Sequence, residues 1–94
     1  MAAYVAIEVK LKNPEKLKAY SQAAGKTVTT HGGNFSIRAA FVEALAGNAD
    51  YDRFVMIEFP DTEAARTWYQ SPEYQALIPM REEGADMTFS LIEG

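Results

Sequence analysis

The sequence predicts an α+β domain in which helices cover one face of a four-stranded antiparallel sheet. Four segments alternate apolar and polar residues as strands do, two segments carry apolar residues at helical spacing, and together they follow the order βαββαβ. The chain has 94 residues, of which 48% are hydrophobic. This is enough for one core and too little for two, so we expect a single domain over residues 1–94.

The first strand is predicted over residues 4–11, where every second side chain is apolar. Asn13, Pro14 and Glu15 then provide an N-cap, a proline suited to the first helical position, and a carboxylate near the positive end of the helix dipole. Apolar residues at helical spacing continue to the glycine pair at 32–33, which favours the end of the helix.

The second strand is predicted over residues 35–46, with a bulge after its first half, because Phe35 and Ile37 alternate with polar neighbours. Residues 47–50 favour a turn. Alternation then resumes over residues 53–59, which predicts the third strand.

The second helix is predicted to begin after Asp61 and to be broken in two. Residues 71–73 (Ser-Pro-Glu) repeat the cap, proline and carboxylate pattern of a helix start, so the helix begins again there. Pro79 is expected to kink or shorten the second piece. Alternation over residues 87–93 predicts the closing strand.

A βαββαβ chain of this length most simply forms a ferredoxin-like sandwich, with both helices on one face of the sheet. Right-handed crossovers place the strands at 4–11 and 53–59 in the centre. The helices are then expected to cover one set of alternating residues, namely Val5, Ile7, Val9, Val55, Ile57, Phe89 and Leu91.

The opposite face of the sheet is predicted to be too apolar for exposure to solvent, because it carries Tyr4, Ala6, Phe54 and Met56. A second copy of the sheet packed on this face would cover it and give a homodimer with the architecture of a dimeric α/β barrel. Polar residues on the same face would line a cavity between the two subunits; these are Glu8, Ser36, Arg38, Glu58, Thr88 and Ser90.

The composition argues against several classes of function. The net charge of −4 opposes binding to nucleic acid, which requires clustered Lys and Arg. No segment has the roughly 20 apolar residues of a membrane span, and no basic leader precedes an apolar run, so we expect a cytoplasmic protein. With one histidine and no cysteine, neither a metal site nor a bound cofactor is expected.

Five stretches carry a resemblance to a known family: Trp-Tyr-Gln-Ser-Pro-Glu-Tyr-Gln-Ala-Leu at 68–77, Val-Met-Ile-Glu-Phe-Pro at 55–60, His31-Gly32-Gly33, Arg38 and the final Glu-Gly. In these stretches the sequence resembles a family of short bacterial proteins called domain of unknown function thirteen-thirty. The resemblance implies a dimeric α/β barrel and no particular activity. Two positions depart from the family pattern. Ala39-Ala40 stand where two glycines are usual, and Asn13 stands where Asp is usual.

His31, Glu58 and Arg38 form the leading hypothesis for an active site. The predicted topology brings His31 and Glu58 to the same end of the sheet, where the histidine could act as a general acid or base oriented by the glutamate. Arg38 would bind an anion, and Glu8, Tyr4 and Ser36 would line the same cavity. A structural alternative stays open, with His31 at a helix end and the charged residues as an ion-pair network.

Tyr74 and Arg81 are secondary candidates for ligand binding. Tyr74 follows the Ser-Pro cap and its hydroxyl could reach a pocket, whereas Arg81 could instead meet the helix dipole or a glutamate of a partner chain. Three functions remain open from the sequence: a cofactor-independent enzyme acting on a small anionic or carbonyl compound, a non-catalytic ligand-binding or sensor dimer, and a dimer without ligand.

Overall fold

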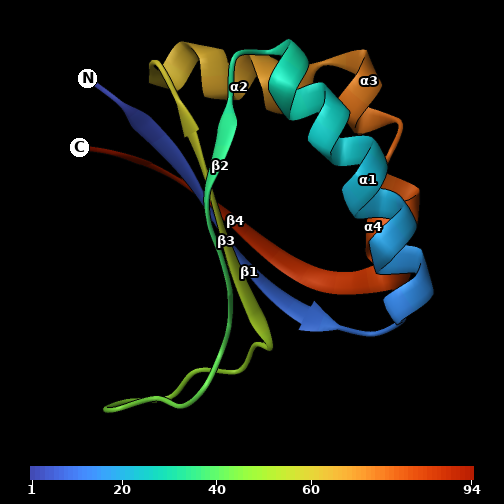
Figure 1. The fold of residues 1–94 in the computed structure, drawn as a ribbon, viewed down its shortest axis with the longest axis vertical. Helices are drawn as coiled ribbons and strands as arrows, with labels where there is room; N and C mark the ends of the chain where they lie inside the picture. The colour runs from blue at the N-terminus through green and yellow to red at the C-terminus, as the bar shows by residue number, and fades with distance from the viewer.

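A four-stranded antiparallel sheet with all helices on one side forms the fold (Figure 1). The structure is a computed structural model that describes all 94 residues. Its elements are β1 (Ala3–Leu11), α1 (Pro14–Thr30), β2 (Asn34–Ala40), β3 (Arg53–Phe59), α2 (Thr62–Gln70), α3 (Pro72–Gln75), α4 (Ile78–Gly84) and β4 (Ala85–Glu93). The strand order is β2-β3-β1-β4, so the predicted fold class and central strands are confirmed.

The predicted helix starts are present. The Asn13 side chain accepts the backbone N–H groups of Glu15 and Lys16 at 3.1 and 3.2 Å, and Asp61 caps α2 in the same way. The prediction of a second helix broken in two is wrong, because three pieces follow β3. Pro79 lies in the first turn of α4, where its missing N–H has no helical partner to lose, so it begins a new piece instead of kinking the old one.

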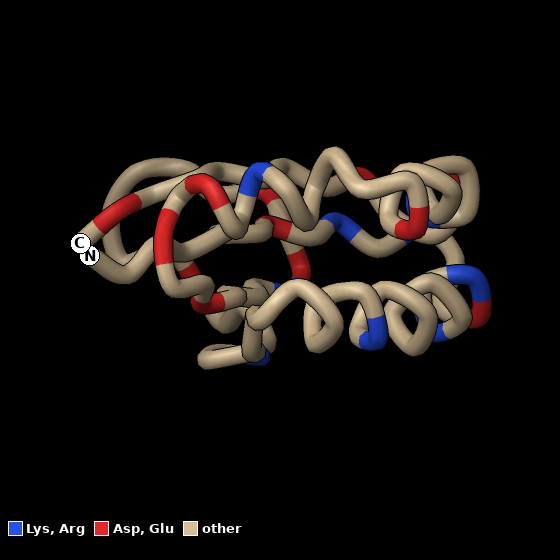
Figure 2. The backbone as a smooth tube through the Cα atoms, turned by 90° about the horizontal axis from the view of Figure 1, so that it is seen from above, with Lys and Arg blue, Asp and Glu red and all other residues tan.

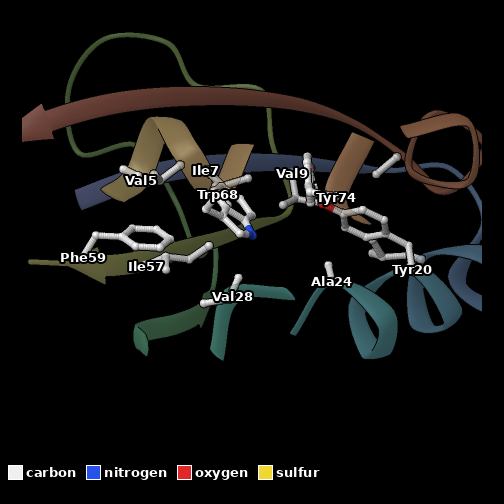
Figure 3. Close-up of a cluster of buried hydrophobic side chains, with 13 residues drawn as sticks. Val5, Ile7, Val9, Tyr20, Ala24, Val28, Ile57, Phe59, Trp68 and Tyr74 are labelled. Carbon is white, nitrogen blue, oxygen red and sulfur yellow. Dashed lines mark hydrogen bonds between the residues drawn. The ribbon is translucent and has the colours of Figure 1, made fainter. Parts of the chain in front are cut away.

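The core lies between the sheet and the helices. Trp68 is 1% exposed, as its helical spacing predicts, and its ring centroid lies 5.5 Å from Phe59 and 4.6 Å from Tyr74. Figure 3 shows these aromatic rings among the buried aliphatic side chains of the sheet and α1. Leu91, which was expected under the helices, is 39% exposed because it lies on the edge strand β4.

Strand β2 contains a bulge earlier than expected, between Phe35 and Ile37. The extra residue reverses the alternation, so Phe35 and Arg38 both face the helices, opposite Ile57 and Val55. Ile37 faces the other side of the sheet, opposite Met56. The prediction that Arg38 lies on the outer face is therefore wrong.

The strand does not continue through residue 46. It ends at Ala40, and residues 41–52 form an irregular segment that projects beyond the sheet (Figure 1). Hydrogen bonds join the base of this segment to β1, from the N–H of Asp52 to the carbonyl of Val9 and from the N–H of Leu11 to the Asp52 carboxylate. Two large apolar residues on the segment are exposed to solvent, Val42 at 86% and Leu45 at 94%.

The charged residues are distributed over both layers. Figure 2 shows the lysines and arginines scattered over the molecule instead of gathered on one face.

None of the helices combines the length and the apolar character that crossing a bilayer requires.

Candidate functional site

A cavity of about 670 Å³ lies between α1 and the sheet, within a single chain. Its walls are mostly apolar. They are formed by Ile7, Val9, Phe35, Val55, Ile57 and Met87 of the sheet, by Leu17, Tyr20, Ala24, Gly25 and Val28 of α1, and by Trp68 of α2. Helix α1 packs beside α4, and two of its small residues, Ala24 and Gly25, line the space above the sheet. The predicted cavity on the outer face would form between two subunits, whereas this cavity forms within one chain.

Gly25 keeps this cavity wide. It lies in the interior of α1 with an ordinary helical backbone, and a Cβ there would meet the Phe35 ring at 3.9 Å, an ordinary contact distance. Alanine is preferred to glycine in a helix by about 0.5–1 kcal/mol. We therefore expect Gly25→Ala to stabilise the protein by about that amount, measured as a higher urea midpoint with an unchanged m-value. A loss of stability would contradict the observed space at this position.

The rim of the cavity is positively charged. Arg38 and Arg53 stand there with Ser21 and Gln22, and all four are exposed. The Arg38 guanidinium lies 4.1 Å from the centroid of the Phe35 ring, an arrangement that leaves its N–H donors free. Neither arginine forms an ion pair, and no aspartate or glutamate lines the cavity. The rim therefore favours an anionic group, although the chain carries a net negative charge.

A cluster of hydroxyl groups around a buried arginine adjoins the cavity. Arg81 is 8% exposed, and its Nη1 donates hydrogen bonds to the hydroxyl oxygens of Tyr69 at 3.1 Å and Tyr74 at 3.0 Å. The Tyr74 and Tyr20 hydroxyls are 2.6 Å apart. We call Tyr20, Tyr69, Tyr74 and Arg81 the tyrosine–arginine cluster.

The cluster holds its charge without a buried carboxylate. Glu82, the acidic partner of Arg81 at 3.3 Å, has a largely exposed side chain, and the Phe89 ring lies 4.9 Å from the guanidinium. Burial alone would lower the pKa of Arg81, but its hydrogen bonds to Tyr69 and Tyr74 outweigh burial and raise it. Burial raises the pKa of Tyr20 and of Tyr74. At neutral pH Arg81 is therefore a cation, and Tyr20 and Tyr74 keep their hydroxyl protons.

The Arg81 side chain turns inward onto the hydroxyls of Tyr69 and Tyr74 and does not line the cavity, so its role in ligand binding stays a prediction. A sequence signal for the inward orientation existed. Tyr74, Leu77 and Arg81 recur at a spacing of three and four residues, which places the arginine on the buried stripe. The participation of the Tyr20 hydroxyl had no such signal, because its pattern is that of an ordinary core residue.

His31 and Glu58, the predicted catalytic pair, are not brought together. His31 caps the end of α1, and its Nε2 lies 3.4 Å from a carboxylate oxygen of Glu73 on α3. Hydrogen bonding to His31 lowers the pKa of Glu73. Glu58 is opposite Tyr4 in the sheet and borders a separate shallow hollow. The expectation of a shared cavity fails because the histidine turns into the helical layer while the glutamate faces the other side of the sheet.

The remaining predicted residues lie on the outer face of the sheet. Tyr4 and Glu8 project from β1, and the Ser36 hydroxyl donates to the Met56 carbonyl at 3.2 Å. Glu8 and Glu58 are four register positions apart, roughly 13 Å at about 3.3 Å per residue. They cannot share a proton at that distance. No group of acidic, histidine or cysteine side chains in the structure could hold a metal ion.

Comparisons with known proteins agree with this fold. Residues 2–94 match the model of the family described as Domain of unknown function (DUF1330). The chain is similar to a protein of unknown function from Rhodopseudomonas palustris, with a TM-score of 0.84, 18% identity, and coverage of 99% of this chain and 82% of the other. A comparison with curated proteins finds no match.

Two further solved structures share the fold. One is a dimeric ferredoxin-like protein of unknown function from Thermobifida fusca, with a TM-score of 0.67, 16% identity, and coverage of 98% and 90% of the two chains. The other is SnoaB, a cofactor-independent oxygenase from Streptomyces nogalater, with a TM-score of 0.67, 13% identity, and coverage of 99% and 91%. At these identities the likeness establishes a ferredoxin-like fold.

Proposed function

This chain belongs to the DUF1330 family, and we propose that it binds a small molecule with a flat apolar body and an anionic group in the cavity between α1 and the sheet. The observation that carries the proposal is the cavity of about 670 Å³, apolar within and lined at its rim by two unpaired arginines. Cavities of this size are typical of small-molecule sites.

The chemistry of the walls defines the ligand. The rings of Phe35 and Trp68 offer flat apolar surfaces, which favour an aromatic or conjugated body. Arg38 and Arg53 favour a carboxylate, sulfonate or similar anion at the opening. Catalysis by His31 and Glu58 is not part of the proposal, since neither residue lines this cavity.

Two fluorescent probes that differ in a single anionic group test the proposal. The probe 1-anilinonaphthalene-8-sulfonate has an apolar body and a sulfonate, and N-phenyl-1-naphthylamine has the same body without it. Both should bind saturably. The variant Arg38→Met should weaken binding of the sulfonate about 3–10-fold and leave binding of the neutral probe unchanged, because an exposed charge pair contributes modestly.

A cavity-filling variant locates the probes. Gly25→Leu places a side chain inside the cavity and should abolish binding of both probes. Ala19→Leu adds the same side chain to the exposed side of α1 and should leave binding intact. Equal binding by wild type and Gly25→Leu would show that the probes bind elsewhere, and absence of binding to the wild type would refute the proposed function.

We also propose that two chains pair through the outer face of the sheet, as a homodimer. The apolar residues Tyr4, Ala6, Phe54 and Met56 lie together on this face, and Ile37 and Ile92 beside them are 43% and 45% exposed. Solved structures with this fold are described as dimeric. In this arrangement Tyr4, Glu8, Ser36 and Glu58 are interface residues.

A further inference from the structure

Tyr20 is the member of the tyrosine–arginine cluster that lines the cavity. It projects from α1, and its hydroxyl lies 2.6 Å from that of Tyr74, which is fully buried on α3. Figure 3 shows the two tyrosines at the end of the core away from Phe59. The cavity and the buried guanidinium of Arg81 are therefore connected through two hydroxyl groups in series.

The direction of these hydrogen bonds follows from the donors available. A guanidinium can only donate, so the Tyr74 oxygen accepts from Nη1 of Arg81 at 3.0 Å. The hydroxyl proton of Tyr74 then needs an acceptor, and the Tyr20 oxygen is the one acceptor that the structure places within reach. If Tyr20 donated instead, the Tyr74 proton would be buried without a partner, at a cost of about 1–3 kcal/mol, whereas Tyr20 lines the cavity, where water or a ligand can accept its proton. Tyr74 therefore donates to Tyr20.

This direction leaves the proton of Tyr20 without an acceptor in the chain. Its only hydrogen-bonding partner among side chains and backbone is Tyr74. Burial keeps the pKa of Tyr20 above its usual value, so the proton is retained at neutral pH. Successive donation from Arg81 through Tyr74 polarises the Tyr20 hydroxyl and strengthens it as a donor.

We infer that Tyr20 donates a hydrogen bond to a carbonyl oxygen of the ligand on the inner wall of the cavity. The inference rests on the proposed function of this cavity and narrows it to an aromatic carbonyl compound. Arg38 at the rim and Tyr20 on the inner wall then bind different groups of the same molecule. Tyr20 thereby makes the cavity prefer ligands that carry a carbonyl oxygen over apolar molecules of equal size.

Two uncharged probes of nearly the same shape test the inference. The first, 2-acetylnaphthalene, carries a carbonyl, and the second, 2-ethylnaphthalene, lacks it. Tyr20→Phe should weaken binding of the acetyl probe about 5–10-fold and change binding of the ethyl probe by less than about twofold, as expected for loss of one hydrogen bond. The matched control Tyr69→Phe removes a cluster hydroxyl that does not line the cavity and should affect neither probe.

A spectroscopic measurement on the wild type does not depend on the variants. The carbonyl stretch of 2-acetylnaphthalene labelled with ¹³C should shift to lower frequency when bound, relative to the same compound in cyclohexane. Absence of this shift, or an equal effect of Tyr20→Phe on both probes, would overturn the role of Tyr20 while leaving the cavity as a binding site. If neither naphthalene binds the wild type, the proposed function fails, and the role of Tyr20 fails with it.

Discussion

Replacing Gly84 with alanine is expected to destabilise the protein by about 2–3 kcal/mol. Gly84 ends α4, and a Cβ there would lie 2.7 Å from the backbone nitrogen of Leu17 and 2.9 Å from its Cα. The backbone cannot move away cheaply, because the Gly84 carbonyl accepts the N–H groups of Lys12 and Asn13 at 2.9 and 3.0 Å. Thermal unfolding should show a fall in Tm of about 10–20 °C for a domain of this size.

Gly25→Ala is the matched control, since it makes the same chemical change in another helix and is expected to raise stability. Opposite signs for the two variants would show that close backbone contact, not loss of chain flexibility, decides the effect. If the free energy of unfolding of Gly84→Ala lay within about 0.5 kcal/mol of that of the wild type, α1 and α4 would not pack as closely as they do in the structure.

The second large effect is expected at the proposed dimer interface. The wild type should have twice the 10.4 kDa mass of the chain in light scattering at micromolar concentration. Met56→Lys should shift the protein to monomers and raise the dissociation constant of the dimer about 100-fold or more. The reason is that two-fold symmetry would bury two unpaired ammonium groups in one interface. Met56 lies opposite Ala6 at the centre of the outer face.

Ala19→Lys is the control for added charge, because Ala19 is exposed on α1, away from this face. It should leave the mass unchanged. Circular dichroism should show that Met56→Lys remains folded, so that any loss of mass reflects dissociation. A wild-type mass of one chain would refute the dimer, and the exposure of Ile37 and Ile92 would then need another explanation.

The parts of the fold that depend on local chemistry could be predicted from the sequence. Alternation over residues 4–11 and 53–59 identifies strands because one face of each must be buried, and their register in the sheet follows this pattern. Asn13 and Ser71 mark helix starts because a side-chain oxygen can accept N–H groups that no helical carbonyl reaches.

The candidate site could be predicted only in part, because it depends on contacts between distant segments. Arg38 was identified as a ligand-binding residue, but the bulge in β2 places it on the helical side of the sheet. Glu73, the partner of His31, lies 42 residues away along the chain, and no spacing rule relates the two. The cavity lies where the small residues Ala24 and Gly25 of α1 face the sheet, which alternation in the strands does not reveal.

The bulge in β2 makes the count of residues in this strand as important as their identity. Removing Ser36 would give a regular strand in which Phe35, Ile37 and Arg38 keep their present sides of the sheet, because Ser36 is the residue without a partner in β3. A regular strand that kept Ser36 would instead present Ile37 to the helices together with Phe35 and would remove the arginine from the rim. In relatives of this chain, an arginine at this position therefore belongs to the cavity where the bulge is present or where the strand is one residue shorter.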